Sequence, residues 1–274
     1  MSATIAVEII NTPEQIGRLV DQLVDIHVSP LDTPAMYIDI EGVALCREGS
    51  ISIFTLLIDT GSGTTPAFLI DVHILGAQAF NTPGTRDKTL KDVLQDESVI
   101  KVFFDVRNDS DALFAHFGVA LQGIEDVQLM ESATRRTRWS RRFVTGLANC
   151  IEQNISAIQR EVWFIAKYQG ERLFKAQHGG SYDVFNQRPM SKEIISYCIG
   201  DVQYLPELRR KFWTHPDQWK KLVMEATAQR VVDSQKLDYQ PLGRKKALAP
   251  WTSKQNNVLD QWYLAPTCVF DWNF

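Results

Sequence analysis

The stretch Tyr37-Ile38-Asp39-Ile40-Glu41-Gly42 places two carboxylates on a predicted β-strand whose other residues are mostly apolar. Side chains alternate between the two faces of a strand, so Asp39 and Glu41 project to the same face. Two neighbouring carboxylates repel each other and lose hydration when buried, which makes this placement costly. Mg²⁺ and Mn²⁺ prefer carboxylate oxygens and remove that cost. The alternative is an edge or barrel strand with one solvated face, and this motif alone leaves both open.

A second candidate motif, Tyr197-Cys198-Ile199-Gly200-Asp201, lies in a helix predicted from Ser191 to Trp213. Tyr197 and Asp201 are four residues apart, so both side chains emerge on one face of the helix. A tyrosine hydroxyl beside a metal-bound carboxylate can orient a metal-bound water for attack. The structural alternative is a half-buried tyrosine near a solvated aspartate, and taken alone the motif favours it.

Between these motifs, residues 101–111 run from an apolar strand into the start of a helix and contain the acids Asp105, Asp109 and Asp111. Helix capping and the helix dipole also favour acids in a first helical turn. We therefore expect at least one of the three to be structural, and the residues themselves do not identify the functional one.

The elements around the motifs indicate an α/β fold. Strand-like segments lie at residues 36–45, 50–59 and 66–73. The short glycine-containing links between them favour antiparallel hairpins. Other predicted elements are helices at 13–26, 89–94 and 108–117, a buried strand at 100–104 and a further strand at 127–130, before a mainly helical part from residue 146 onward. This order predicts a mixed sheet with helices on both faces.

Length and composition are those of an ordinary globular protein, with 274 residues, 45% hydrophobic residues and 23% charged residues. The four cysteines, Cys46, Cys150, Cys198 and Cys268, stand singly, which argues against a zinc ribbon or a disulfide scaffold. No apolar run reaches membrane-helix length, and the N-terminus lacks the pattern of a secretory signal. We therefore expect an intracellular protein, cytoplasmic or nuclear, without a membrane partner.

We expect residues 1–232 to form one domain, with its core at about 35–213. Residues 233–274 are rich in Lys, Pro, Trp, Tyr and Asn and have weak periodicity. We interpret them as a C-terminal extension that wraps the domain or lies on its surface and has no core of its own.

Taken in order, the three motifs resemble the DEDDy group of 3′→5′ exonucleases, in the branch that includes ribonuclease D and the Egalitarian-like and EXD-type exonuclease domains. Asp39 and Glu41 match the first family motif, and Tyr197 and Asp201 match its Y-x-x-x-D motif. Aligning Lys101-Val102-Phe103 with the second motif places the family aspartate at Asp109. The segments 188–190 and 201–205 also look like the R-P-L and D-V-x-x-L stretches of the family.

The resemblance implies an RNase H-like α/β/α sandwich and a hydrolase that acts on 3′ ends of single-stranded nucleic acid, with RNA slightly favoured over DNA. It implies that Asp39, Glu41, Asp109 and Asp201 hold two Mg²⁺ or Mn²⁺ ions, while Tyr197 positions the attacking water. Two departures bear on substrate choice. One is Phe104, where ribonuclease D-like sequences often carry His, and the other is the stretch 135–181, which matches no family pattern.

One short segment concentrates five arginines around a tryptophan in an otherwise acidic chain. A guanidinium group can donate two parallel hydrogen bonds to a phosphate, and an indole ring can stack on a base. We expect a nucleic-acid-binding path here, whereas the alternative is a solvated loop or a cluster paired with acids elsewhere. Its residues are Arg135, Arg136, Arg138, Trp139, Arg141 and Arg142.

Two other readings are open. A non-catalytic nucleic-acid-binding or scaffold protein could retain the exonuclease fold, although loss of turnover usually shows as a missing metal ligand and none is missing here. The other is an unrelated α/β protein whose acids match by chance.

Overall fold

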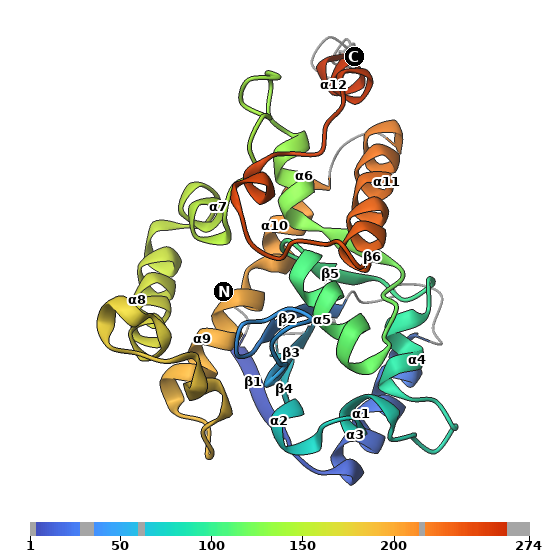
Figure 1. Ribbon diagram of the computed structural model, residues 1–274, viewed down its shortest axis with the longest axis vertical. Helices are drawn as coiled ribbons and strands as arrows, with labels where there is room; N and C mark the ends of the chain where they lie inside the picture. Colours follow the sequence, from blue (N-terminus) through green and yellow to red (C-terminus); the bar gives the residue numbers. More distant parts are fainter. Residues whose placement is uncertain (1–3, 28–35, 60–63, 214–216, 262–274) are drawn as a thin grey trace, which may run out of the picture.

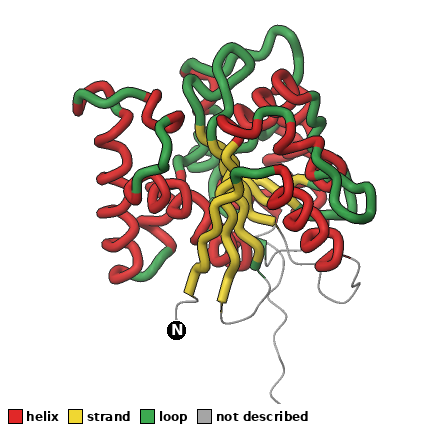
Figure 2. The backbone as a smooth tube through the Cα atoms, turned by 90° about the horizontal axis from the view of Figure 1, so that it is seen from below, coloured by secondary structure: helices red, strands yellow, loops and turns green. Residues whose placement is uncertain are grey.

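The computed structural model describes residues 4–27, 36–59, 64–213 and 217–261. In these residues six strands form one mixed sheet in the order β1-β4-β3-β2-β5-β6 (Figures 1 and 2). The strands are β1 (Thr4–Ile10), β2 (Met36–Glu41), β3 (Ile53–Ile58), β4 (Thr64–Asp71), β5 (Lys101–Phe103) and β6 (Ile124–Asp126). Strands β2, β3 and β4 are antiparallel, β5 and β6 continue parallel to β2, and β1 pairs in parallel with β4. The predicted fold class is confirmed.

Helices cover both faces of the sheet, and each face has its own hydrophobic cluster (Figure 1). One face carries α1 (Pro13–His27), α2 (Val72–Leu75), α3 (Gln78–Asn81), α4 (Leu90–Gln95) and α5 (Arg107–Phe117). The other carries α6 (Val127–Ala133), α7 (Leu147–Asn154), α8 (Ala157–Phe174), α9 (Lys192–Gln203), α10 (Leu205–Phe212) and most of α11 (Asp217–Ser234). Because Ile38 and Ile40 belong to the first cluster, Asp39 and Glu41 project toward the second, where α9 packs against β2.

Strand β2 ends at Glu41, earlier than predicted, because the chain folds tightly back at Gly42. A Cβ atom on Gly42 would lie 1.9 Å from the carbonyl oxygen of Ser50, so a larger residue would not fit there. The Ser50 N–H donates to the carbonyl oxygen of Val43 at 2.9 Å and closes this turn. The second carboxylate therefore lies at the very end of a central strand.

Two predicted elements differ from the structure. The strand expected at 127–130 is wrong, because Asp126 ends β6 and its side chain accepts a hydrogen bond from the Gln128 N–H, which starts helix α6. The helix expected from Ser191 to Trp213 is divided into α9 and α10 near Tyr204. Pro206, in the first turn of α10, has no N–H to continue the hydrogen bonding of a single helix.

The C-terminal segment packs against the domain. It contains the short helices η3 (Arg244–Ala247) and α12 (Ser253–Gln261), and Leu248 forms an isolated β-bridge with Phe143. Trp251 and Leu259 belong to the hydrophobic cluster that includes α6, and the Trp251 indole N–H donates to the hydroxyl of Ser132 on α6 at 2.9 Å. Up to Gln261, this segment therefore contributes side chains to the core of the domain. No helix in the described ranges is long and apolar enough to cross a membrane.

Candidate active site

Three of the predicted carboxylates meet where β2 ends against α9. Asp39 and Glu41 reach this point from β2 and Asp201 from α9, and each offers an oxygen within 4.8 Å of the other two. The sheet brings together residues that are 160 positions apart in sequence because α9 packs directly on β2 and β3. The first and third motifs therefore form one cluster.

The cluster is electrostatically costly. Burial, followed by the nearby Asp201, raises the pKa of Glu41 to about 8 and that of Asp39 well above its usual range. Asp109 adds to both effects. The Oδ2 atom of Asp39 is buried and has no hydrogen-bond partner. A divalent cation takes carboxylate oxygens of this kind as ligands, so the donor set fits Mg²⁺ or Mn²⁺.

A lysine that sequence reasoning missed completes the cluster. The ammonium group of Lys167, on α8, lies 2.6 and 2.7 Å from the two carboxylate oxygens of Asp201. It also lies 3.9 Å from the centre of the Tyr197 ring. Burial lowers the pKa of Lys167, but Asp201, Glu41 and Asp39 together outweigh this effect and raise the pKa overall, so the side chain is a cation. The sequence does indicate that Lys167 faces inward, because it lies at helical spacing from Trp163, Gly170 and Phe174, which are the buried residues of α8.

Tyr197 is held tightly beside the carboxylates. Its ring packs edge-on against Phe174, with centroids 5.1 Å apart, and against Phe185 at 6.2 Å. Helix α8 approaches closely at Gly170, where a Cβ atom would lie 2.6 Å from the Tyr197 Cβ. Burial, followed by Glu41 and Asp201, raises the pKa of the Tyr197 hydroxyl, which therefore keeps its proton near neutral pH.

Asp109 lies outside the group of three mutually close carboxylates, although its charge affects Asp39 and Glu41. It is buried in the first turn of α5, and burial raises its pKa to about 7. The two neighbouring acids of its motif are ion-paired, Asp105 with Arg107 and Asp111 with Arg47. Asp109 makes no ion pair within the described residues.

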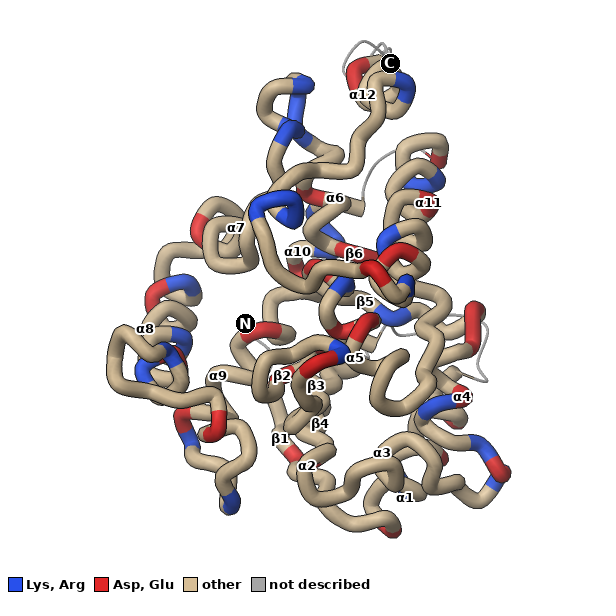
Figure 3. Tube along the Cα trace, in the orientation of Figure 1, with Lys and Arg blue, Asp and Glu red and all other residues tan. Residues whose placement is uncertain are grey.

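The arginine-rich segment is divided between internal contacts and the surface. Arg135 makes a two-pronged ion pair with Glu131 at 2.8 and 2.6 Å. Arg138 and Arg141 both pair with Asp260 of α12, and Arg141 is only 1% exposed. Figure 3 shows the resulting basic loop beside α12.

The surface part of this segment contains Arg136, Trp139 and Arg142. Trp139 is 77% exposed, and the Arg142 guanidinium lies 5.6 Å from its ring centre. This pair has the form of a stacking platform, whereas Arg135, Arg138 and Arg141 hold the loop in place.

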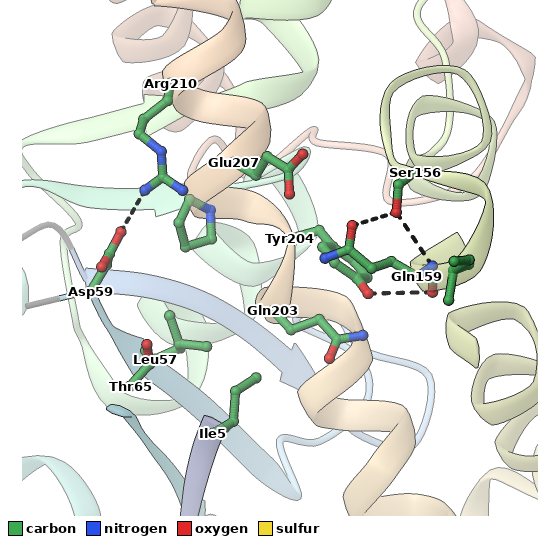
Figure 4. Close-up of a pocket in the computed structure, with 12 residues that line it drawn as sticks. Ile5, Leu57, Asp59, Thr65, Ser156, Gln159, Gln203, Tyr204, Glu207 and Arg210 are labelled. Atoms are coloured by element: carbon green, nitrogen blue, oxygen red, sulfur yellow. Dashed lines mark hydrogen bonds and ion pairs between the residues drawn. The ribbon is translucent and has the colours of Figure 1, made fainter. Parts of the chain in front are cut away.

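A pocket of about 600 Å³ lies apart from the carboxylate cluster, between β1, β3 and helices α8 to α10 (Figure 4). None of the predicted catalytic or nucleic-acid-binding residues lines it. Arg210 and Asp59 pair across one side at 2.8 Å, and the Tyr204 hydroxyl donates to the Gln159 carbonyl oxygen on the other. The pocket holds no group of mutually close carboxylates within the described residues, so the carboxylate cluster is the better candidate for chemistry.

Comparison with known proteins gives consistent results. Residues 8–216 match the profile of the 3′-5′ exonuclease family. The piRNA biogenesis protein EXD1 of Xenopus laevis is 27% identical over 175 residues, which cover 61% of this chain and 35% of that protein. The chain thus spans about a third of the length of the curated relatives it matches.

Solved structures with similar folds include ribonuclease D of Trypanosoma brucei in complex with RNA U12. Its TM-score is 0.68 at 19% identity, covering 94% of this chain and 80% of that one. NrnC of Brucella melitensis with bound Mg²⁺ has a TM-score of 0.53 at 18% identity, covering 88% of this chain and 99% of that one. At these identities the similarity shows a shared fold.

The first prediction concerns Lys167. In metal-free buffer at neutral pH, Lys167→Met should lower the free energy of unfolding by about 3 kcal/mol, because a buried ion pair loses one partner. Mn²⁺ should then raise the melting temperature of the variant more than that of the wild type, because it supplies the missing positive charge. Calorimetry with EDTA and with Mn²⁺ measures both. Lys175→Met, in the more exposed pair with Glu171 on the same helix, is the control and should change little. Equal stability of Lys167→Met and wild type in EDTA would contradict this role.

The second prediction concerns pH. Because the pKa of Glu41 is raised from 4.5 to about 8, the folded protein keeps a proton that the unfolded chain releases. Without metal, the contribution of Glu41 to stability is therefore full below about pH 4.5 and is lost as the pH rises to about 8. The slope is at most about 1.4 kcal/mol per pH unit for one proton.

Urea unfolding in EDTA between pH 5 and 8 measures this slope in the wild type and in Glu41→Gln, which cannot titrate. The slope should be smaller in the variant. Saturating Mg²⁺ should flatten the wild-type curve, because it binds the ionised carboxylates. Identical slopes in the two proteins would rule out Glu41 as the titrating group.

Proposed function

The chain belongs to the 3′-5′ exonuclease family, in its DEDDy, ribonuclease D-like branch, and we propose that it hydrolyses single-stranded nucleic acid from the 3′ end in a metal-dependent reaction. One observation carries the proposal: the carboxylates of Asp39, Glu41 and Asp201 converge beside Tyr197, and one Asp39 oxygen is buried without a partner. Four of the five positions that the resemblance assigns to catalysis are thus close together, and their carboxylate oxygens suit a divalent cation.

Each residue has a defined role in this proposal. Asp39, Glu41 and Asp201 would hold two Mg²⁺ or Mn²⁺ ions, with Asp109 supporting the second from α5. When bound, the ions would lower the pKa of a water molecule and stabilise the charge that develops on the phosphate. Tyr197 keeps its proton, so it acts as a hydrogen-bond donor that orients the water and not as the base that removes its proton.

Lys167 positions Asp201 in this scheme. Its ammonium contacts both Asp201 oxygens and lies over the ring of Tyr197, so it fixes the two residues of the third motif relative to each other. Its positive charge also reduces the repulsion that a phosphodiester meets near three carboxylates.

We favour RNA over DNA as the substrate. Support comes from a fold neighbour solved with RNA and from curated relatives named for piRNA biogenesis. Trp139 and Arg142 offer an exposed indole and guanidinium, a combination that binds bases and phosphates of single strands without sequence preference.

One observation favours a second candidate function. An ammonium group already neutralises Asp201, which would weaken metal binding at this carboxylate. A non-catalytic protein that binds nucleic acid through the same fold is therefore the alternative to a hydrolase.

The third prediction tests activity directly. With Mn²⁺ or Mg²⁺, a 5′-labelled single-stranded RNA should give a ladder that shortens from its 3′ end, and EDTA should abolish it. Asp39→Ala should lower the rate by about 100-fold or more, because it removes a ligand from the metal site. Glu97→Gln, which changes an exposed acid outside the carboxylate cluster, is the matched control and should retain full activity.

The same assay with DNA ranks the two substrates. Cleavage that survives in Asp39→Ala would refute the site assignment. Binding of RNA or DNA without cleavage of either would favour the non-catalytic alternative.

The fourth prediction concerns the surface platform. The double variant Trp139→Ala/Arg142→Ala should weaken RNA binding about tenfold and reduce the salt dependence of binding by about one counterion, with kcat unchanged. Fluorescence anisotropy at several salt concentrations measures the affinity. Arg141→Ala should lower thermal stability instead, because Asp260 would lose one of its two arginine partners. Unchanged affinity in the double variant would exclude the platform as a binding surface.

A further inference from the structure

Helix α8 has an apolar face that is largely exposed in the described structure, where Tyr168 makes one ring contact, with His178 at 5.9 Å. Its inner face packs on α9 and carries Lys167, as described above. On its outer face Ile158 is 81% exposed, Val162 65%, Ile165 54% and Tyr168 55%. Four large apolar side chains on one helix face exceed the scattered exposure of ordinary surfaces and mark an interaction site.

This face includes a shallow hollow of about 540 Å³ lined by six residues of α8 alone. They are Glu161, Phe164, Ile165, Tyr168, Gln169 and Arg172. Their spacing, i, i+3, i+4, i+7, i+8 and i+11, is the same when read in either direction along the helix. Reading it backwards exchanges Glu161 with Arg172, Phe164 with Gln169 and Ile165 with Tyr168.

We propose that α8 packs antiparallel against α8 of a second copy of this chain, around a twofold axis that passes between Ala166 and Lys167. In this pairing Ile165 lies beside the partner's Tyr168, and Phe164 lies beside the partner's Gln169. Each contact occurs twice, as a twofold interface requires. The occupant is a second copy because the spacing of the face is symmetric about its centre and its two ends carry opposite charges.

The charges at the two ends of the face determine the direction of the pairing. Glu161 and Arg172 make no ion pair within the described residues. They are eleven residues apart, about 16 Å along a helix. In the antiparallel arrangement each Glu161 meets the partner's Arg172, whereas a parallel arrangement sets glutamate against glutamate. The pairing therefore attracts at both ends and is apolar in the middle.

The fifth prediction is a concentration-dependent dimer. Sedimentation velocity on the full chain should show a monomer–dimer equilibrium, and Ile165→Glu should give a monomer, because it buries a charge beside the partner's Tyr168 at two symmetric positions near the centre of the interface. Leu242→Glu, at a position that is 82% exposed in the C-terminal segment, is the matched control and should dimerise like the wild type. Circular dichroism verifies that each variant is folded.

Charge reversal tests the direction of the pairing. Glu161→Arg and Arg172→Glu should each weaken the dimer about tenfold, because each creates two like-charge contacts. An equimolar mixture of the two variants should form a heterodimer about as tight as the wild-type dimer, since every end contact then joins opposite charges. Rescue by mixing cannot arise from an effect within one chain.

Each contrary result overturns the proposal. A wild-type chain that stays monomeric at high micromolar concentration would show that this face does not bind a second copy, and a different macromolecule would then be its partner. A dimer that is insensitive to Ile165→Glu would place the interface elsewhere. Failure of the mixture to restore dimerisation would exclude the antiparallel arrangement. None of these outcomes depends on nuclease activity.

Discussion

The arrangement of this protein depends on the repulsion between carboxylates that the fold forces together. Asp39 and Glu41 project from β2 toward the buried Asp201, and their partial burial strengthens the interaction between the like charges. Lys167 offsets part of this electrostatic cost by pairing with Asp201. Because the pKa of Glu41 is raised to about 8, its carboxylate also binds a proton near neutral pH, which removes a further part of the repulsion. A site that is held against its own repulsion binds cations strongly, because a cation removes repulsion and gains ligands at the same time.

Holding these charges in place requires rigid surroundings. Strand β2 lies in the interior of the sheet, and α9 is fixed to α8 by the hydrogen bond from the Trp163 indole to the Gly200 carbonyl oxygen at 2.7 Å. Because Gly170 has no side chain, α8 and α9 approach so closely that its backbone lies directly against the Tyr197 side chain. A larger residue at Gly170 would separate α8 from α9 and move Lys167 away from Asp201. The packing of α8 on α9 thus determines the electrostatics of the site.

Much of this could be predicted from the sequence, because it depends on local patterns. Alternating apolar residues and short glycine links indicate the antiparallel strands, and the spacings Asp39–Glu41 and Tyr197–Asp201 fix which side chains share a face. The strand predicted at 127–130 failed because one capping aspartate, Asp126, outweighed an apolar run. Lys167 could not be assigned, because its partner is 34 residues away and only the packing of α8 on α9 brings them together. For the same reason Asp260, which engages Arg138 and Arg141, could not be foreseen from the arginine-rich segment.

The contact between α12 and the basic loop has an evolutionary consequence. A single acid, Asp260, holds two arginines of the loop that presents Trp139, and it lies far along the chain from every residue of the carboxylate cluster. Mutations in α12 can therefore reshape the loop without touching the carboxylate cluster. Under the proposed function, selection would tune nucleic-acid binding through α12 and the loop while it conserves the carboxylate cluster. Divergence among relatives with this arrangement should concentrate in the tail and the loop, with changes in one compensated by changes in the other.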